Sequence, residues 1–250
     1  MSHPALCCCF SACVAPLPYR VKLCLFLCLC GVLALLVSCA DSPMGLSVSG
    51  NFSNPYQVQI DQWVRRNPPA VYVQPTVTPD HAPRALFVPL RITQDMNNRL
   101  SIGNNISRQI WQVWLSQQAF SVLEYTDTGR PFSAREAIAL GRQRGAELVV
   151  GGYITHFMDG SSYGDSSVSL AIEVYEVATG TLLWSMAQGA TMEKQAASDF
   201  YVFQVNSRMP ADPVSLIVRT LADDMGKPLV YWVHPDRRPK GWSLSHGKAF

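Results

Sequence analysis

The sequence has no cysteine after position 39, although eight cysteines occur in its first 39 residues. Residues 40–250 therefore cannot form a disulfide or a thiolate metal site, which suits an oxidising compartment. Histidine is also sparse in this part of the chain, and no two histidines lie four residues apart with a carboxylate between them, as a zinc-protease motif requires. We expect neither a metal nor another cofactor.

Neither sign of charge is in excess after the N-terminal segment. Arg20 and Lys22 are the only two of the 20 Lys and Arg that precede Cys39, so the chain from Cys39 carries 18 cations against 18 acidic residues. A nucleic-acid partner would need a clustered basic surface, and we expect none. The local exception is residues 234–250, a basic tail that we interpret as a solvated end rather than a site for an anionic partner.

One long apolar run occurs, from Leu23 to Ala40, and Arg20 and Lys22 stand before it. A basic segment, an apolar stretch and then small residues is the order of a secretory signal peptide. The alternative is a transmembrane anchor, because the length of the run approaches a bilayer span. The run ends in Val-Ser-Cys-Ala rather than in bulky residues, so we predict a signal peptide at residues 1–38.

The last residues of this run, Leu36-Val37-Ser38-Cys39, resemble the lipobox of bacterial lipoproteins. The resemblance implies that the signal peptidase recognises Leu36, Val37 and Ser38. It also implies that Cys39 becomes the first residue and carries an acyl anchor, such as palmitate, in a lipid bilayer. Ala40 follows the cysteine, where an aspartate would signal inner-membrane retention, so the resemblance implies an outer-membrane protein that faces the periplasm.

Residues 39–83 are rich in Pro, Ser, Asn and Gln, which predicts a tether. Fully extended, such a segment would reach on the order of 140 Å. As a flexible coil its root-mean-square span would be roughly 35–40 Å. Two apolar patches, Val58 to Val64 and Val71 to Val73, leave open the alternative that each docks on the domain as a strand or short helix.

Regular periodicities begin at Arg84. Residues 85–90 read as a strand, and apolar residues from Ile102 to Trp114, spaced by three and four, predict a helix. A short strand at 121–125 precedes a second helix that starts with the capping box Ser133 to Glu136 and stops at Gly145. The β-rich run from Glu147 to Ile154 suits a strand that is buried on both faces.

The clearest pair of strands follows. Val168 to Tyr175 alternates apolar and polar residues, Val177 to Gly180 turns the chain, and Leu182 to Met186 continue the apolar face. A last helix is predicted from Asp212 to Gly226 and Pro228. The order is β-α-β-α-β-β-β-α, and we predict a single α/β sandwich domain at residues 84–233, after the signal peptide and the tether.

Two stretches, Gly145 to Gly152 and Ala178 to Trp184, resemble the α/β domain shared by the curli-export lipoprotein, an outer-membrane activator of penicillin-binding proteins and the amino-terminal domain of TolB. The resemblance covers roughly residues 84–230. It implies no enzyme activity, and contact with an envelope protein or self-association. The curli protein inserts membrane hairpins, but residues 155–167 and 193–212 lack two strands of the required length.

Two functions are compatible with this resemblance. The first is a non-enzymatic accessory subunit of an envelope machine, such as a secretion or flagellar-type assembly. The second is a tethered activator of a peptidoglycan synthase, for which the Pro-rich segment would supply the reach.

A remote alternative is a serine hydrolase that uses Ser162. Gly160 to Gly164 matches the G-x-S-x-G nucleophile elbow, and Asp199 and His234 follow in the required order. The elbow needs a strand-to-helix turn, whereas this segment joins two predicted strands. We therefore expect a flexible loop here and no catalytic residue.

Overall fold

The computed structural model describes residues 46–49, 56–194, 198–199 and 203–240, which belong to one compact unit that begins at Gly45. The predictions for residues 1–38 and for Leu36, Val37, Ser38 and Cys39 lie outside these residues. No helix in the described ranges is both long and apolar enough to cross a membrane.

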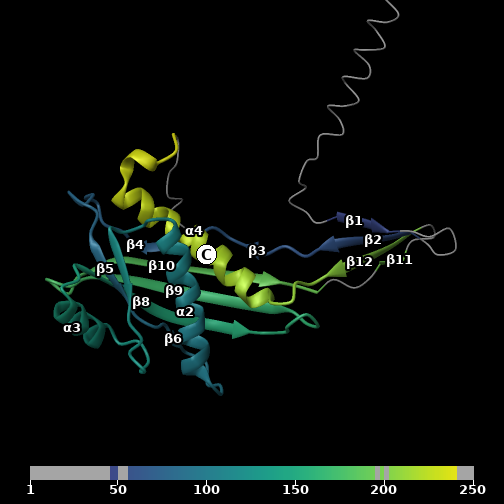
Figure 1. The fold of residues 1–250 in the computed structure, drawn as a ribbon, viewed down its shortest axis with the longest axis horizontal. Coiled ribbons are helices and arrows are strands. Elements are labelled where there is room, and N and C mark those ends of the chain that lie inside the picture. The colour runs from purple at the N-terminus through teal and green to yellow at the C-terminus, as the bar shows by residue number, and fades with distance from the viewer. Residues whose placement is uncertain (1–45, 50–55, 195–197, 200–202, 241–250) are drawn as a thin grey trace, which may run out of the picture. The chain divides into compact units, whose positions relative to one another are not determined.

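Three α-helices and a mixed set of strands make up the described residues (Figure 1). The helices are α2 (Arg99–Ser116), α3 (Ala134–Arg144) and α4 (Pro213–Val233), and a 3-10 turn follows at Pro235–Arg237. The strands are β1 (Leu46–Ser49), β2 (Tyr56–Asp61), β3 (Arg65–Arg66), β4 (Ala70–Val73), β5 (Arg84–Phe87), β6 (Arg91–Ile92), β7 (Val122–Tyr125), β8 (Leu148–Met158), β9 (Ser166–Glu176), β10 (Leu182–Met192), β11 (Ser198–Asp199) and β12 (Phe203–Arg208).

The main sheet has eight strands. Its central order is β3-β10-β9-β8-β5-β7, with β4 also on β10 and β6 also on β8. Strands β5 and β6 pair in parallel with their neighbours, and the remaining pairs are antiparallel. A mixed α/β fold is therefore confirmed. The predicted element order is incomplete, because β6, β11 and β12 interrupt it and β1 to β4 precede it.

Helices α2 and α4 cover one face of the main sheet (Figure 1). Trp114 of α2 and Trp184 of β10 are almost fully buried beneath them, and Trp114 Nε1 donates a hydrogen bond to Ala222 O at 2.8 Å. Successive residues of a strand point to opposite faces of the sheet. The strand residues that point away from α2 and α4, among them Val149, pack against α3 in a smaller apolar cluster. The part of that second face beyond α3 is called the outer face below.

The last helix is longer than predicted. Asp212 is its N-cap and accepts a hydrogen bond from Ser215 N, as expected, but α4 continues through Gly226 and Pro228 to Val233. Its final turns bury Leu229 and other apolar residues against the core, so packing outweighs the cost of an internal proline.

The segment from 56 to 73 is part of the sheets. Val71 to Val73 form β4, which pairs with β10, so the docking alternative is confirmed for this patch. Strand β2 pairs with β1 in an antiparallel manner and with β12 in parallel, and β11 completes a second, four-stranded sheet. The hydrogen bond from Gln62 N to Arg208 O, at 3.0 Å, continues the pairing beyond β2 and β12.

Candidate functional site

Ser162 lies in the turn between β8 and β9. Gly164 N donates to Gly160 O at 2.8 Å, and Ser161 N donates to Asp159 Oδ1 at 2.8 Å, so the segment closes a strand-to-strand turn. No helix begins here to supply an oxyanion hole. His234, the suggested base, has its Nε2 atom 3.2 Å from Gln118 O, in the segment that follows α2. The geometry gives Ser162 no catalytic setting.

The other histidines in the described ranges are dispersed. His81 Nε2 lies 2.9 Å from Glu147 Oε2, and His156 Nε2 lies 2.8 Å from Ser167 Oγ. No three His, Cys, Asp or Glu side chains in the described ranges are grouped so that they could hold a metal ion.

The outer face carries a shallow depression of about 440 Å³, which we call the outer groove. It crosses four strands, β8, β9, β10 and β3. Its lining residues are mostly small or polar: Arg65, Arg66, Asn67, His156, Ser167, Ser169, Gly189, Ala190 and Thr191.

The floor of the outer groove is formed by small residues. Gly189 and Ser169 are cross-strand partners, and a Cβ atom on Gly189 would lie 2.7 Å from Ser169 Oγ. Arg65 stands at one wall and His156 at the other, on strands that are three spacings, or about 14 Å, apart. The groove therefore offers hydroxyl and cationic groups to a polar partner over a span of several residues.

The Ser167–His156 contact in this groove is a serine–imidazole pair, which raises the question of catalysis. Among the described side chains, no carboxylate contacts the other ring nitrogen of His156. The pair therefore lacks the acid that would complete a Ser-His-Asp triad. Ser167 is also 7% exposed. We interpret the pair as part of the structure of the groove wall.

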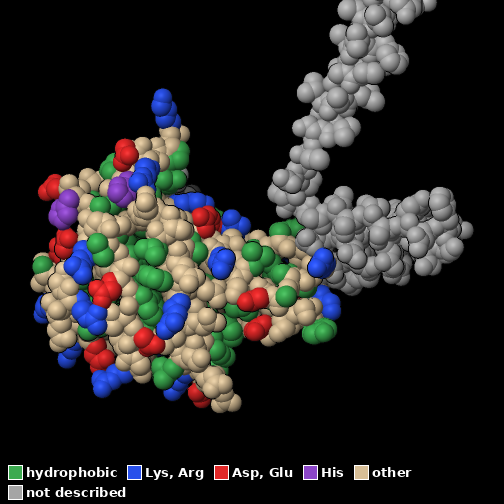
Figure 2. Space-filling view, in the orientation of Figure 1, with side chains coloured by type: hydrophobic (Ala, Val, Ile, Leu, Met, Phe, Trp, Pro, Cys, Tyr) green, Lys and Arg blue, Asp and Glu red, His purple; other side chains and the backbone are tan. Residues whose placement is uncertain are grey.

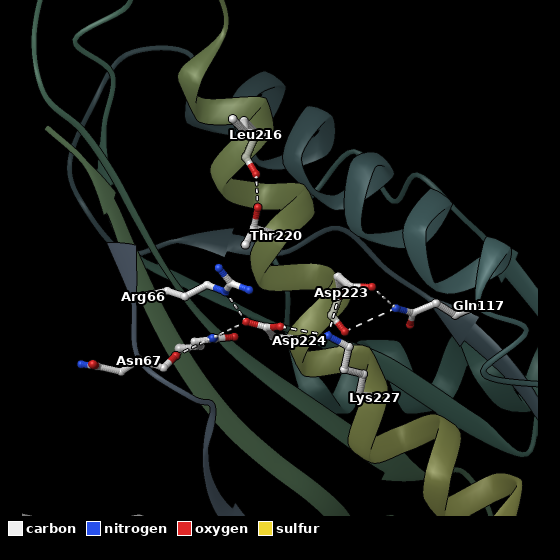
Figure 3. A network of polar contacts seen from close by, with 9 residues as sticks. Arg66, Asn67, Gln117, Leu216, Thr220, Asp223, Asp224 and Lys227 are labelled. Carbon is white, nitrogen blue, oxygen red and sulfur yellow. Dashed lines mark hydrogen bonds and ion pairs between the residues drawn. The ribbon is translucent and has the colours of Figure 1, made fainter. Parts of the chain in front are cut away.

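On the opposite face, six polar side chains form the α4 cluster (Figure 3). Arg66 of β3 forms an ion pair with Asp224 of α4, and Gln188 of β10 donates to the same carboxylate at 3.2 Å. Lys227 Nζ lies 2.7 Å from Asp223 Oδ2, and Gln117, the C-cap residue of α2, donates to Asp223 Oδ1 at 2.9 Å. The cluster thus fastens β3 and α2 to the last helix.

Asp224 is the more buried of the two neighbouring aspartates in the α4 cluster. Its side chain is only 15% exposed, because β3 and β10 lie against α4 at this point. Burial by itself would raise the pKa of Asp224, but hydrogen bonds from Arg66, Gln188 and Lys227 outweigh that effect and hold the pKa below its ordinary value. Asp223 is half exposed.

Replacing Asp224 with asparagine is expected to lower the free energy of unfolding at pH 7 by about 1–3 kcal/mol, because Arg66 and Lys227 lose a charged acceptor. The folded pKa of Asp224 lies below the unfolded one, so its stabilising effect is present above the unfolded pKa and is lost as pH falls through the folded pKa. Urea unfolding at pH 7 and near pH 3 measures both quantities.

The matched control is Asp223→Asn in the same helix, whose carboxylate is more exposed and should contribute less. A gap between wild type and Asp224→Asn that stays constant down to pH 3 would show that the Asp224 charge does not stabilise the fold.

Away from the α4 cluster, charges of both signs are interspersed on the helix-bearing side of the molecule (Figure 2). Arg and Lys side chains lie beside Asp and Glu side chains over this face and do not gather into a region of one sign. This face therefore does not present a strong electrostatic attraction to a highly charged partner.

The outer groove was not found from the sequence. Its residues form no motif, and they come from strands that lie up to 126 positions apart, from Arg65 to Thr191. The one available signal is the alternation in β9, where Ser167, Ser169 and Ala171 occupy the outward positions. That pattern indicates a half-exposed strand but says nothing about the strands beside it.

Comparison with known proteins gives structural neighbours only. No protein-family model matches the sequence, and no curated protein sequence matches it significantly. A PelC dodecamer from Paraburkholderia phytofirmans is similar, with a TM-score of 0.44 and 14% identity over 67% of this chain and 96% of that chain.

Two further neighbours are smaller. Lipoprotein GNA1162 from Neisseria meningitidis has a TM-score of 0.33 and 18% identity over 46% of this chain and 88% of its own. The LpoB C-terminal domain from Salmonella enterica has a TM-score of 0.25 and 16% identity over 46% of this chain and 86% of its own. These neighbours match the lipoprotein group that the sequence resembles. All three TM-scores lie below 0.5, so they do not transfer a function to this chain.

Proposed function

We propose that the protein is a lipid-anchored component of the cell envelope that acts by binding a protein partner and not by catalysis. The signal peptide ends at Ser38, Cys39 carries the acyl anchor in the outer membrane, and the α/β domain faces the periplasm. The outer groove and the sheet face around it are the contact surface.

The position of Cys39 is the observation that carries this proposal. Only six residues, 40–45, separate it from Leu46, the first residue of β1. The chain then supplies β1 to β4 to the two sheets, and Arg66 in β3 is held by Asp224 in α4. An anchor at Cys39 would therefore keep the start of β1 within about 25 Å of the acylated sulfur, which is the reach of seven Cα–Cα steps.

Two roles are compatible with a protein that binds a partner. An accessory subunit of a secretion or flagellar-type machine is supported better than a tethered activator of a peptidoglycan synthase. An activator that must reach a distant partner needs a long free tether. Here β2, β3 and β4 already occupy residues 56–61, 65–66 and 70–73. Deleting residues 45–80 would thus remove strands of both sheets and could not test reach alone.

The contact surface can be tested with a photo-crosslinking amino acid in the full-length protein in its membrane. Thr191 is exposed and lines the outer groove, so a benzophenone residue at this position should give one discrete adduct of higher mass. The control position is Leu216 on α4, which is 41% exposed on the opposite side of the sheet and should give none. Equal adducts at both positions, or none at Thr191, would refute the outer groove as the contact surface.

The anchor is tested in the same cells with Cys39→Ser. Without the acylated cysteine the protein should leave the outer-membrane fraction, and the Thr191 adduct should become weaker because the local concentration at the membrane is lost. Unchanged membrane attachment of Cys39→Ser would count against the lipid anchor.

A further inference from the structure

A second open pocket, of about 450 Å³, lies at the end of β8, β9 and β10 that is opposite to the outer groove. Along β9, Ser167 of the outer groove and Glu176 of this pocket are separated by about 30 Å. We call it the proline pocket. Its lining residues are Pro75, Thr76, Val77, Thr78, Pro79, Pro83, Glu147, Leu148, Glu176, Leu183 and Trp232.

The lining of the proline pocket is largely apolar, and its polar groups are mostly hydrogen-bond acceptors. The prolines have no backbone N–H to offer. The indole N–H of Trp232 already donates to Val77 O at 2.8 Å. Glu147 and Glu176 add two carboxylates, whereas no Lys, Arg or His occurs among the described lining residues. A ligand that complements this lining has an apolar body and a cationic hydrogen-bond donor.

The two carboxylates stand at the same end of neighbouring strands. Val177 N donates to Glu147 O at 2.9 Å, which places Glu147 beside the last residue of β9, Glu176. Glu147 Oε2 lies 2.9 Å from His81 Nε2. Glu176 accepts a hydrogen bond from Thr179 Oγ1 but forms no ion pair with a described side chain. This pair of acidic groups therefore attracts a Lys or Arg side chain from outside.

The wall of the proline pocket is held in place without a ligand. It is formed by residues 75–83, which connect β4 to β5. The bond from Trp232 to Val77 fixes this segment to α4, and the ring of Trp232 in turn meets Trp184 edge to face at 5.9 Å. At its other end, Arg84 N donates to Glu147 Oε1 at 3.1 Å. A pocket that is already formed loses little conformational freedom on binding, so more of the contact energy remains as affinity.

We propose that the proline pocket binds a peptide segment of a partner protein, one that presents an apolar side chain next to a Lys or Arg. The apolar side chain enters beside Leu183 and Trp232, and the cation reaches Glu176. Val77 at the rim is 74% exposed, so a small molecule inside the pocket would leave it in water, whereas a longer peptide covers it. This is a second binding site, and it depends neither on the outer groove nor on the lipid anchor.

The test measures the binding of a defined probe by fluorescence anisotropy. The full-length gene product is extracted from membranes in a neutral detergent, so that lipid charge does not bind the probe. The probe is the fluorescein-labelled peptide Gly-Lys-Leu-Trp-Lys-Gly, the Lys peptide. Its matched controls are Gly-Glu-Leu-Trp-Glu-Gly and Gly-Lys-Ser-Ser-Lys-Gly. The Lys peptide should bind at least about tenfold more tightly than either control, and its affinity should fall as salt is added.

Two variants place this binding in the proline pocket. Glu176→Gln removes one charge at nearly constant shape, and Val77→Ser removes an exposed apolar contact. Each should weaken binding of the Lys peptide about threefold or more. The matched control is Glu136→Gln, because Glu136 is an exposed carboxylate in the first turn of α3 and does not line the pocket. Its affinity for the Lys peptide should equal that of the wild type.

Four results would overturn the proposal. The first two are an absence of binding by the Lys peptide and equal binding of the Lys and Glu peptides. The third is an affinity that neither Glu176→Gln nor Val77→Ser lowers. The fourth is binding that occurs only after residues 241–250 are deleted, or only below the concentration at which the protein self-associates. These would assign the pocket to the chain's own basic tail and to a second copy of the chain, respectively.

The photo-adduct at Thr191 separates this inference from the proposed function. It should persist in Glu176→Gln, because the two sites lie at opposite ends of the strands. Loss of the Thr191 adduct in this variant would show one shared site and overturn the inference of a second one. Failure of the Lys peptide with an intact adduct would remove the proline pocket alone and leave the outer groove as the contact surface.

Discussion

Replacing Gly152 with alanine is expected to lower the free energy of unfolding by about 3 kcal/mol or more. Gly152 lies in the middle of β8 with a φ angle of 143°, which residues with a Cβ atom rarely adopt. An added Cβ would lie 2.1 Å from Ala171 O and 3.1 Å from Ile172 Cα, both in β9. Backbone atoms of a paired central strand cannot move aside without disturbing the β8–β9 register, so strain and overlap add.

Urea unfolding followed by circular dichroism measures this effect. The control is Gly129→Ala, because Gly129 also has a positive φ, 61°, but no atom lies within 4 Å of a Cβ built there. Backbone strain alone should cost Gly129→Ala about 1–2 kcal/mol. Similar losses for the two variants would mean that the contact of β8 with β9 at Gly152 is looser than described.

Replacing Trp114 with alanine is expected to lower the free energy of unfolding by about 3–5 kcal/mol. The indole is fully buried between α2, α4 and the main sheet, and it meets the ring of Phe87 edge to face at 5.8 Å. The variant leaves a cavity and also deprives Ala222 O of the donor Trp114 Nε1. The shift of the urea midpoint at an unchanged slope gives the value.

The control for Trp114→Ala is Leu115→Ala, the next residue of the same helix. Leu115 is 47% exposed, so its truncation should cost no more than about 0.5–1 kcal/mol. A loss for Trp114→Ala as small as that of Leu115→Ala would contradict the description of α2 as a core helix.

Local patterns in the sequence were sufficient for several elements of the domain. Strand β8 is fully buried from Leu148 to Gly152, as its unbroken β-rich run indicated. Helix α3 ends at Gly145, which has a φ of 63°, because a residue without a Cβ atom can take the left-handed cap. Ser133 is the N-cap of α3, but it makes no side-chain capping hydrogen bond, so the predicted capping box is wrong.

Pairings between distant segments could not be predicted in this way. Strand β3 has only two residues, Arg65 and Arg66. It is held in place by its pairing with β10 and by the ion pair of Arg66 with Asp224. Strand β12 pairs in parallel with β2, so Phe203 and Tyr56 are partners although 147 positions separate them. Periodicity describes which face of one strand is apolar, but it carries no information about the strand beside it.

The candidate sites also differ in whether their residues are contiguous in the sequence. The proposed anchor sequence, Leu36 to Cys39, is a contiguous motif, so it could be predicted from the sequence and stays a prediction. The outer groove is assembled from small residues of four strands, and Ser169 opposite Gly189 is visible only once the register of β9 and β10 is known. At Ser162 a contiguous motif gave a misleading signal. The G-x-S-x-G pattern matches, but the segment joins two strands and so lacks the strand-to-helix turn that a nucleophilic serine needs.

The intact mass of the mature protein tests the proposed lipid anchor at Cys39. The full-length gene product is expressed in a Gram-negative host, extracted from membranes in mild detergent and measured by mass spectrometry. We expect a chain that begins at Cys39 and carries added acyl mass. A chain that retains residues 1–38 and carries no acyl mass would contradict the lipid anchor and, with it, the placement of the domain on the membrane.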